Sequence, residues 1–383
     1  MINNLNKRVL ILGGYGRLGA RIAQMLSVEP EIQLIISGRN KALADRCAKK
    51  LGGIAEGLRL QRDAINLAAQ LKALHLDLLI HCAGPIQNDS DNRVAKACIE
   101  SRTPYIDISN ARRSVCDFHR LSPAAEAAGI AMVSGAGTLP ALSSAALAEI
   151  QRELPIIHSV EIAVAPAHYT NCELGTAGTG LKSLGQSFPQ LQKGRWHESF
   201  SGKHLRPVTL AHPVGKRWLS DSDAPDLELC PRHFPQLHSA RFATGLEPRT
   251  VQVCLSACAH LIRQHLPLPT TQLAVLGCKL SAHWPGGSPH SGMVVRAGGE
   301  NRQGESTTKQ WQILGLNGDG AWISAAPAVA LSRQFLQGNA PKAGAQACWQ
   351  LLDLDDILME LNNFSVVTAL ETLTRERLPA LTC

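Results

Sequence analysis

Glycines near the start of the chain have the spacing of a nucleotide-binding loop, G-x-G-x-x-G, directly after a short apolar run. The loop residues are Gly14, Tyr15, Gly16, Arg17, Leu18 and Gly19. The first glycine of such a loop permits a tight turn, the second lets a pyrophosphate approach the backbone, and the third brings the next helix close. The N-terminus of that helix binds anions. The alternative is a plain glycine-rich turn, but the position between a strand and a helix favours dinucleotide binding.

The end of the second predicted strand indicates which dinucleotide is bound. An NAD site has an Asp or Glu there for the ribose 2′-hydroxyl, whereas this chain continues with Ser37, Arg39 and Asn40. A guanidinium binds a phosphate through two N–H groups, and a neutral serine leaves room for that phosphate. We therefore expect NADP, with Arg39 on the 2′-phosphate and Arg17 and Ser37 assisting. The alternative for Arg39 is an ordinary solvent-exposed charge.

Small residues follow the fourth predicted strand, where ligands of open α/β sheets bind. Ala83, Gly84 and Pro85 come directly after the apolar run of residues 77–82. Their open backbone predicts contact with the ribose and nicotinamide, and the alternative is a simple turn that ends the strand. His81 lies inside the same run, where a histidine is more often a hydrogen-bonded core residue than a catalyst.

Asp107 is a candidate catalytic residue at the end of the fifth predicted strand. It shares a strand face with Tyr105, since side chains two residues apart point the same way. In that position it either orients substrate and relays a proton, or caps the following turn with its carboxylate. The sequence leaves both interpretations open.

A polar cluster follows a later predicted strand and precedes the glycine-rich GTAGTG. Its members are His168, Tyr169, Asn171, Cys172 and Glu173. Such a set can form a substrate pocket and supply a general acid or base, and we take His168 and Tyr169 as catalytic candidates. The alternatives are an ordinary loop and, for Cys172, either a thioester-forming thiol or a small apolar residue.

Six apolar runs in the first third of the chain are the strands that must position these residues. They cover residues 9–12, 32–36, 54–60, 77–82, 105–108 and 130–133. Helical patterns separate them, so we expect a doubly wound parallel sheet.

The composition is that of an ordinary globular protein. The 383 residues are 45% hydrophobic and 18% charged, which gives room for two domains and a full core. The net charge is +7 but scattered, and aromatics are only 4%, so we expect no nucleic-acid partner. The 11 dispersed cysteines, with no secretory pattern, no long apolar run and no zinc spacing, predict a cytoplasmic protein without a membrane span or a metal site.

Four segments together give a resemblance to a known family. GGYGRLG, SGRN, HCAGP and PYIDIS follow or form the first, second, fourth and fifth predicted strands. The chain resembles the saccharopine dehydrogenase-like NADP oxidoreductases, with weaker similarity through GAGTLPALSSAA and the later G-D-G turn. The resemblance implies a Rossmann domain, a second α+β domain with the substrate pocket, a C-terminal segment that folds back, and a homodimer. It also makes Arg112 and Arg113 the best candidates for clamping a substrate carboxylate.

We expect an NADP-binding domain over 1–136, a substrate and dimerisation domain over 137–325, and a C-terminal helical segment over 326–383. The predicted strands of the second domain cover residues 160–165, 251–255, 273–280, 292–297 and 310–316. The stretch at 251–255 can equally begin a helix. Prolines and histidines across 207–248 suggest irregular loops, and 326–336 and 354–361 are predicted helices.

The expected function is hydride transfer between NADP and a C=N or C=O group of a small, amino-acid-like substrate. The nicotinamide carries the hydride, while the protein aligns the reactants and provides an acid or base. The alternative is a non-catalytic NADP(H)-binding protein that acts as a redox sensor or scaffold. It predicts tight NADPH binding without turnover.

Overall fold

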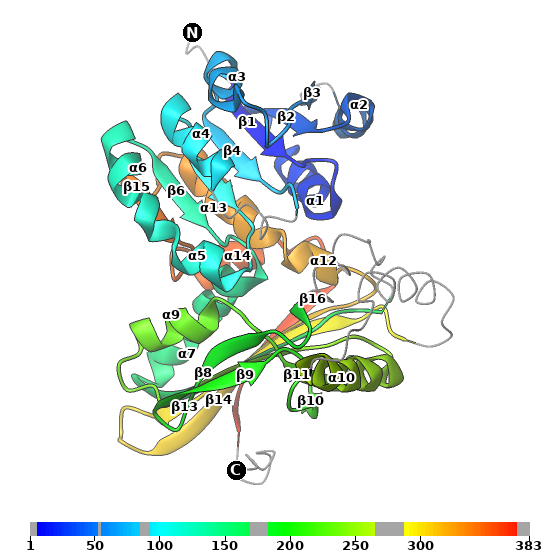
Figure 1. Cartoon of the computed structure of the whole chain (residues 1–383), viewed down its shortest axis with the longest axis vertical. Helices are drawn as coiled ribbons and strands as arrows, with labels where there is room; N and C mark the ends of the chain where they lie inside the picture. Colours follow the sequence, from blue (N-terminus) through cyan, green and yellow to red (C-terminus); the bar gives the residue numbers. More distant parts are fainter. Residues whose placement is uncertain (1–5, 53–54, 85–91, 169–182, 265–286, 374–383) are drawn as a thin grey trace. The chain divides into compact units, whose positions relative to one another are not determined.

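The computed structural model describes residues 6–52, 55–84, 92–168, 183–264 and 287–373. The chain forms two compact units, each built around its own sheet (Figure 1). The first unit comprises Met1–Leu142 and Trp322–Leu361, and the second comprises Ser143–Ala321 and Asn362–Cys383. The predicted domain boundaries, after residues 136 and 325, lie a few residues from these divisions and stay predictions.

The first unit contains a seven-stranded, wholly parallel sheet, and its strands β1 to β6 confirm the six predicted ones. Its order is β15-β6-β5-β4-β1-β2-β3. The bounds are β1 (Lys7–Leu12), β2 (Ile32–Gly38), β3 (Ala55–Arg59), β4 (Leu78–His81), β5 (Tyr105–Asp107), β6 (Ala131–Ser134) and β15 (Gly344–Ala347). The order reverses between β1 and β4, so ligands are expected at the carboxyl ends of these two strands.

Helices cover this parallel sheet. They are α1 (Arg17–Leu26), α2 (Lys41–Leu51), α3 (Leu67–Leu74), α4 (Arg93–Ser101), α5 (Arg112–Cys116), α6 (Ser122–Ala128), α13 (Ala326–Leu336), α14 (Leu354–Met359) and the short turns η2 (Phe118–Leu121) and η3 (Thr138–Leu142). In α1, the apolar face formed by Ile22, Ala23 and Leu26 is fully buried. The returning helix α13 packs against α1 and β4, so the C-terminal segment folds back on the first unit as expected, but only as far as Leu361, since the residues from Asn362 belong to the second unit.

The second unit contains a mixed seven-stranded sheet in the order β10-β11-β12-β7-β13-β14-β16. The strands are β7 (Ile156–Ala165), β10 (Arg206–Thr209), β11 (Lys216–Asp221), β12 (Ser239–Thr244), β13 (Ser291–Glu300), β14 (Ser306–Gly315) and β16 (Val366–Leu373). Only β7 and β12 pair in parallel among its described neighbours, so their carboxyl ends lie side by side. A separate hairpin is formed by β8 (Ser187–Gln192) and β9 (Arg195–Phe200).

The helices of the second unit correct two expectations. They are α7 (Ser143–Glu153), α9 (Asp226–His233) and α10 (Arg249–Arg263), while α12 (Gly320–Ile323) spans the division between the units. The strand predicted over 251–255 is wrong and the helix left open for the same stretch is confirmed, since residues 249–263 form α10. This helix buries a polar face in which Gln252 donates to Ser220 Oγ and Ser256 to Gly202 O. The region 207–248 is not irregular either, since it contains three strands and α9.

The C-terminal region contains strands that the helical prediction missed. Residues 344–347 form β15 at the edge of the first sheet, and 366–373 form β16 at the edge of the second. Neither strand coincides with a long apolar run. Edge strands bury little side-chain surface, so their hydrophobic pattern is weak. The predicted strand over 273–280 lies outside the described residues.

Candidate functional site

The glycine loop joins β1 to α1 and depends on Gly13, which the motif had not singled out. Gly13 has φ +84°, a backbone conformation that side chains disfavour. A Cβ there would lie 2.6 Å from Ala83 N, so the loop packs directly on the turn after β4. Gly14 is buried beside Ile11, and a Cβ at Gly19 would lie 2.4 Å from Gly13 O. Close packing therefore explains why glycine is required at both ends of the loop, at Gly14 and at Gly19.

The N-terminus of α1 lacks a side-chain cap. The N-cap residue is Gly16, which as a glycine has no side chain that could cap the helix. The first turn, which begins at Arg17, contains no acidic residue. Leu18 and Arg17 are partly exposed there. An uncapped helix start with no carboxylate nearby is a favourable place for a phosphate group.

Tyr15 covers the end of β2. A Cβ at Gly38 would lie 2.5 Å from a ring carbon of Tyr15, and the Tyr15 hydroxyl accepts a hydrogen bond of 3.1 Å from Asn40 N. Ser37 is completely buried, and its hydroxyl donates to Ile11 O at 3.1 Å. The Ser37 hydroxyl is thus engaged in a hydrogen bond inside the sheet. The exposed surface at the end of β2 is formed by Tyr15 and by the residues after Gly38.

Arg39 and Asn40 lead from β2 into α2. Asn40 is the N-cap of α2, and its side-chain oxygen accepts from Leu43 N at 3.2 Å. Arg39 is exposed and forms no ion pair with any described residue. No carboxylate lies at the end of this strand, so the Arg39 guanidinium is available to a phosphate.

Ala83 and Gly84 follow β4 beside the glycine loop. A Cβ at Gly84 would meet no atom within 4 Å, so the space in front of this turn is open among the described residues. Arg62 contacts this turn, since its Nη1 donates to Ala83 O at 3.4 Å. Pro85, the third residue predicted here, lies outside the described residues.

Asp107 lies at the end of β5 in a complete hydrogen-bond network. Its Oδ1 accepts from Ser109 N at 2.8 Å, Ser134 Oγ at 2.9 Å and Gly135 N at 3.1 Å. Its Oδ2 accepts from Tyr105 OH at 3.0 Å. Burial raises the pKa of the Asp107 carboxyl, and the four hydrogen bonds oppose this effect. These contacts match the turn-capping interpretation and leave the carboxylate little freedom to act on a ligand.

His81 is buried next to this network. It pairs in register with Asp107, and its Nδ1 accepts from Ala83 N at 3.4 Å. Burial, with a smaller effect from the Arg62 charge, lowers the pKa of His81 to about 3. The imidazole is therefore neutral at physiological pH and belongs to the core, as the sequence had favoured.

His168 lies in the second unit, directly after β7. Its backbone N donates to Ser288 O at 3.0 Å, and its Nδ1 lies 2.9 Å from Glu247 O. Because a carbonyl only accepts, Nδ1 carries the proton and Nε2 is the basic nitrogen of the neutral ring. Tyr169, predicted as its partner, lies outside the described residues.

A small pocket of about 180 Å³ lies at the carboxyl ends of β7 and β12. Its lining includes Glu247 and the cations Lys216, Arg217 and Arg249, which give a net charge of +2. Glu247 pairs with the buried Arg217, and the Arg249 guanidinium stacks over the Trp218 ring at 4.2 Å. None of these lining residues was predicted individually from the sequence, because most of them come from the region 207–248, which was interpreted as irregular loops over or beside the substrate pocket. The one available signal was the density of charge around 216–249.

His168 does not line this pocket, but it packs against Gly287, which does. A Cβ at Gly287, which lines the pocket, would lie 2.4 Å from His168 Cγ. Arg112 and Arg113 lie elsewhere, on α5 of the first unit. Arg112 is buried and Arg113 pairs with Asp117. Arg112 and Arg113 stay predictions, and the pocket cations are further candidates for binding a substrate anion.

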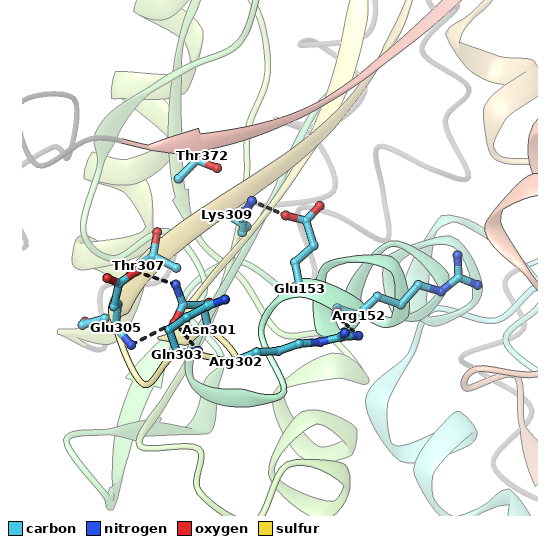
Figure 2. A pocket seen from close by; sticks show the side chains of 10 residues that line it. Arg152, Glu153, Asn301, Arg302, Gln303, Glu305, Thr307, Lys309 and Thr372 are labelled. Carbon is cyan, nitrogen blue, oxygen red and sulfur yellow. Dashed lines mark hydrogen bonds and ion pairs between the residues drawn. The ribbon is translucent and has the colours of Figure 1, made fainter.

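A larger, open groove lies elsewhere in the second unit, between the end of α7 and the β13–β14 turn. It has a volume of about 840 Å³. Figure 2 shows Lys309 turned toward Glu153, with which it forms an ion pair, and Arg302 beside the end of α7. Arg152 pairs with Glu149, and Asn301 bonds Glu305 within the turn. Because most of these polar groups satisfy one another, the groove is a polar surface rather than a prepared binding site.

Two absences hold for the part of the chain that the structure describes. No cluster of three or more His, Cys, Asp or Glu side chains is placed to ligate a metal ion. No helix combines the length and apolar character that crossing a membrane requires.

Comparisons with known proteins agree with this geometry. Residues 9–133 match the family model described as Saccharopine dehydrogenase NADP binding domain. The apo structure of saccharopine dehydrogenase (L-Glu forming) from Saccharomyces cerevisiae superposes with a TM-score of 0.68 at 15% identity, over 96% of this chain and 100% of that one. This likeness shows a shared fold. No curated protein sequence matches the chain.

Two further solved structures are more distant. A meso-dapdh mutant from Clostridium tetani E88 gives a TM-score of 0.45 at 13% identity, over 91% of this chain and 95% of that one. Biliverdin reductase from Synechocystis sp. PCC 6803 gives a TM-score of 0.42 at 11% identity, over 94% of this chain and 96% of that one.

The matching family model identifies NADP as the cofactor of the first unit. The residues fit that cofactor. The start of α1 is uncapped, the space before Gly84 is open, and Arg39 follows β2 where an NAD enzyme would place a carboxylate.

Proposed function

We propose that this chain, whose residues 9–133 are a saccharopine dehydrogenase-type NADP-binding domain, is an oxidoreductase acting on a small, amino-acid-like anion. The reacting group would be a C=N or C=O bond. The observation that carries this proposal is the cationic pocket at the ends of β7 and β12, with its net charge of +2.

The shape and charge of the pocket favour a compact substrate with at least one carboxylate. Lys216 and Arg249 are exposed and form no ion pair among the described residues, so their charges are available. Arg217 is already neutralised by Glu247. Stacking on Trp218 fixes the plane of the Arg249 guanidinium, which then offers parallel N–H groups to a carboxylate.

His168 is the residue that we assign to proton transfer. Hydride reduction of an imine or carbonyl adds a hydride at carbon and a proton at nitrogen or oxygen, and bound NADPH supplies the hydride. The carbonyl of Glu247 fixes the Nδ1–H tautomer of His168, so Nε2 is the atom that would hold the proton. Nε2 is buried, so it would have to become exposed before it could deliver that proton to a substrate. Tyr169, the next residue, stays a candidate partner. The contacts of Asp107 support a structural role instead.

The experiment is a survey of NADPH oxidation with 2-oxo acids, with and without amines, followed by the reverse reaction with amino acids. Lys216→Gln and Arg249→Gln should each raise KM for an acid substrate about 10- to 100-fold, with a smaller effect on its uncharged amide. Lys193→Gln, at an exposed turn of the same unit, is the matched control. Equal KM values for the acid and the amide in the wild-type protein would contradict carboxylate recognition.

The same measurements test the non-catalytic alternative. A redox sensor or scaffold would bind NADPH tightly and turn over none of these substrates. The buried states of His81 and Asp107 in the first unit favour that alternative, because neither can readily exchange a proton with a ligand. A homodimer and a cytoplasmic location also stay proposals, and light scattering of the purified protein tests the first.

A further inference from the structure

Arg59, the last residue of β3, lies beside the end of β2. It pairs in register with Gly38, and Leu60 N donates to Gly38 O at 3.0 Å. Residues that pair in a parallel sheet project from the same face. A Cβ on Gly38 would point into the Tyr15 ring, so Arg59 projects on the side of the sheet where Tyr15 lies.

The charge of Arg59 is uncompensated. Arg59 is exposed and, like Arg39, has no ion-pair partner among the described residues. Glu56 on β3 pairs with Arg8, and Asp45 on α2 pairs with Lys41, so neither of these carboxylates forms an ion pair with Arg59. Two guanidinium groups without an ion-pair partner among the described residues therefore lie at the carboxyl ends of neighbouring strands, since Arg59 is the last residue of β3 and Arg39 follows β2.

The start of α2 adds to this positive potential. Asn40 caps Leu43 N, and the first turn of α2 contains no acidic residue. The helix dipole therefore favours an anion at this end. Like charges at the ends of neighbouring strands repel one another unless a counter-ion neutralises them.

We propose that Arg59 is a second ligand of the NADP 2′-phosphate, opposite Arg39. A phosphate monoester carries a charge of about −1.5 to −2 at pH 7, which one guanidinium does not neutralise. Arg39 meets it from the β2–α2 connection and Arg59 from β3, with the Tyr15 ring against Gly38 between them. This assignment rests on NADP as the cofactor and makes β3 part of the specificity for NADP over NAD.

The test compares the equilibrium binding of NADPH, NADH and 2′,5′-ADP to purified variants, by calorimetry or fluorescence. Arg59→Gln should raise Kd for NADPH and 2′,5′-ADP about tenfold and leave Kd for NADH unchanged, while Arg59→Lys restores part of the loss. Arg46→Gln is the control, since Arg46 is exposed and unpaired among the described residues of the same unit, on α2.

Each outcome decides the proposal. Equal weakening of NADPH and NADH, or no change in either, overturns the role of Arg59 while leaving NADP as the cofactor. A wild-type protein that binds NADH as tightly as NADPH contradicts the cofactor assignment itself. Circular dichroism of Arg59→Gln separates loss of binding from loss of folding.

Discussion

The Tyr15 ring lies against the backbone of Gly38, where a single added methyl group would approach a ring carbon to 2.5 Å. The contact joins the glycine loop to the end of β2, the two segments expected to hold the adenosine half of NADP. Gly38 does not have a positive φ, so alanine fits its backbone conformation. Gly38→Ala should therefore displace Tyr15 rather than unfold the unit, and weaken NADPH binding about tenfold in a titration.

A double-mutant cycle provides the control for this contact. Tyr15→Ala removes the ring, so adding Gly38→Ala to it should have no further effect on Kd. Additive losses in the double variant would show that the two positions act independently.

Asp107→Asn should lower stability without slowing the chemical step. Oδ1 of asparagine can keep the bonds from Ser109, Ser134 and Gly135, while the amide group disturbs the bond to Tyr105. We expect a loss of about 1–3 kcal/mol in the free energy of unfolding and a kcat within about threefold of wild type. Urea unfolding and steady-state kinetics measure the two quantities.

A catalytic Asp107 would behave differently. Loss of a general acid or base lowers the rate by about 10²- to 10⁴-fold. Such a fall in kcat, at substrate saturation and with NADPH affinity retained, would return Asp107 to the catalytic residues.

The first unit was predicted well from the sequence because each of its strands and loops is signalled by residues that are adjacent in the chain. Buried parallel strands are continuous apolar runs, and the glycine loop and SGRN directly follow two of them. What the motif could not reveal was Gly13 and Gly38, whose constraints come from Ala83 and Tyr15 far along the chain. Such contacts depend on how the loops pack.

The second unit was harder because its elements carry mixed signals. In α10 the buried face contains Gln252 and Ser256, whereas Val253 is 42% exposed, so hydrophobic periodicity was misleading. The pocket joins Arg217 and Glu247, which lie on different elements separated by 30 residues of chain. Only the pairing of β11, β12 and β7 brings them together.

Arg333 on α13 holds the returning segment to the first unit. It pairs with Glu29 after α1 and, at 2.7 Å, with the half-buried Glu360. Arg333→Met should lower the free energy of unfolding by about 3 kcal/mol, because it leaves the Glu360 carboxylate without its cation. Glu29→Gln, which removes a more exposed partner, should cost less than about 1 kcal/mol. Urea unfolding measures the loss in the free energy of unfolding for both variants. Equal losses in Arg333→Met and Glu29→Gln would argue against a special role for Glu360.

Asp226 is a buried carboxyl in the second unit that forms no ion pair with any described residue. Oδ1 accepts from Ser143 Oγ at 2.5 Å, and Oδ2 is buried without a hydrogen-bond partner among the described residues. Burial raises the pKa of Asp226 to about 6, although the bond from Ser143 opposes the shift. The folded protein therefore favours the protonated acid.

The sign of the resulting pH dependence follows from this raised pKa. The stability contributed by protonated Asp226 is complete below about pH 4, the range of an unfolded aspartate, and is lost as pH rises through about 6. Asp226→Asn mimics the protonated form, so it should match wild type near pH 4 and become more stable by about 3 kcal/mol at pH 8. Urea unfolding of both proteins across this range isolates the effect, since all other groups cancel in the difference. A difference that does not change with pH would mean that Asp226 titrates at its ordinary pKa in the folded protein.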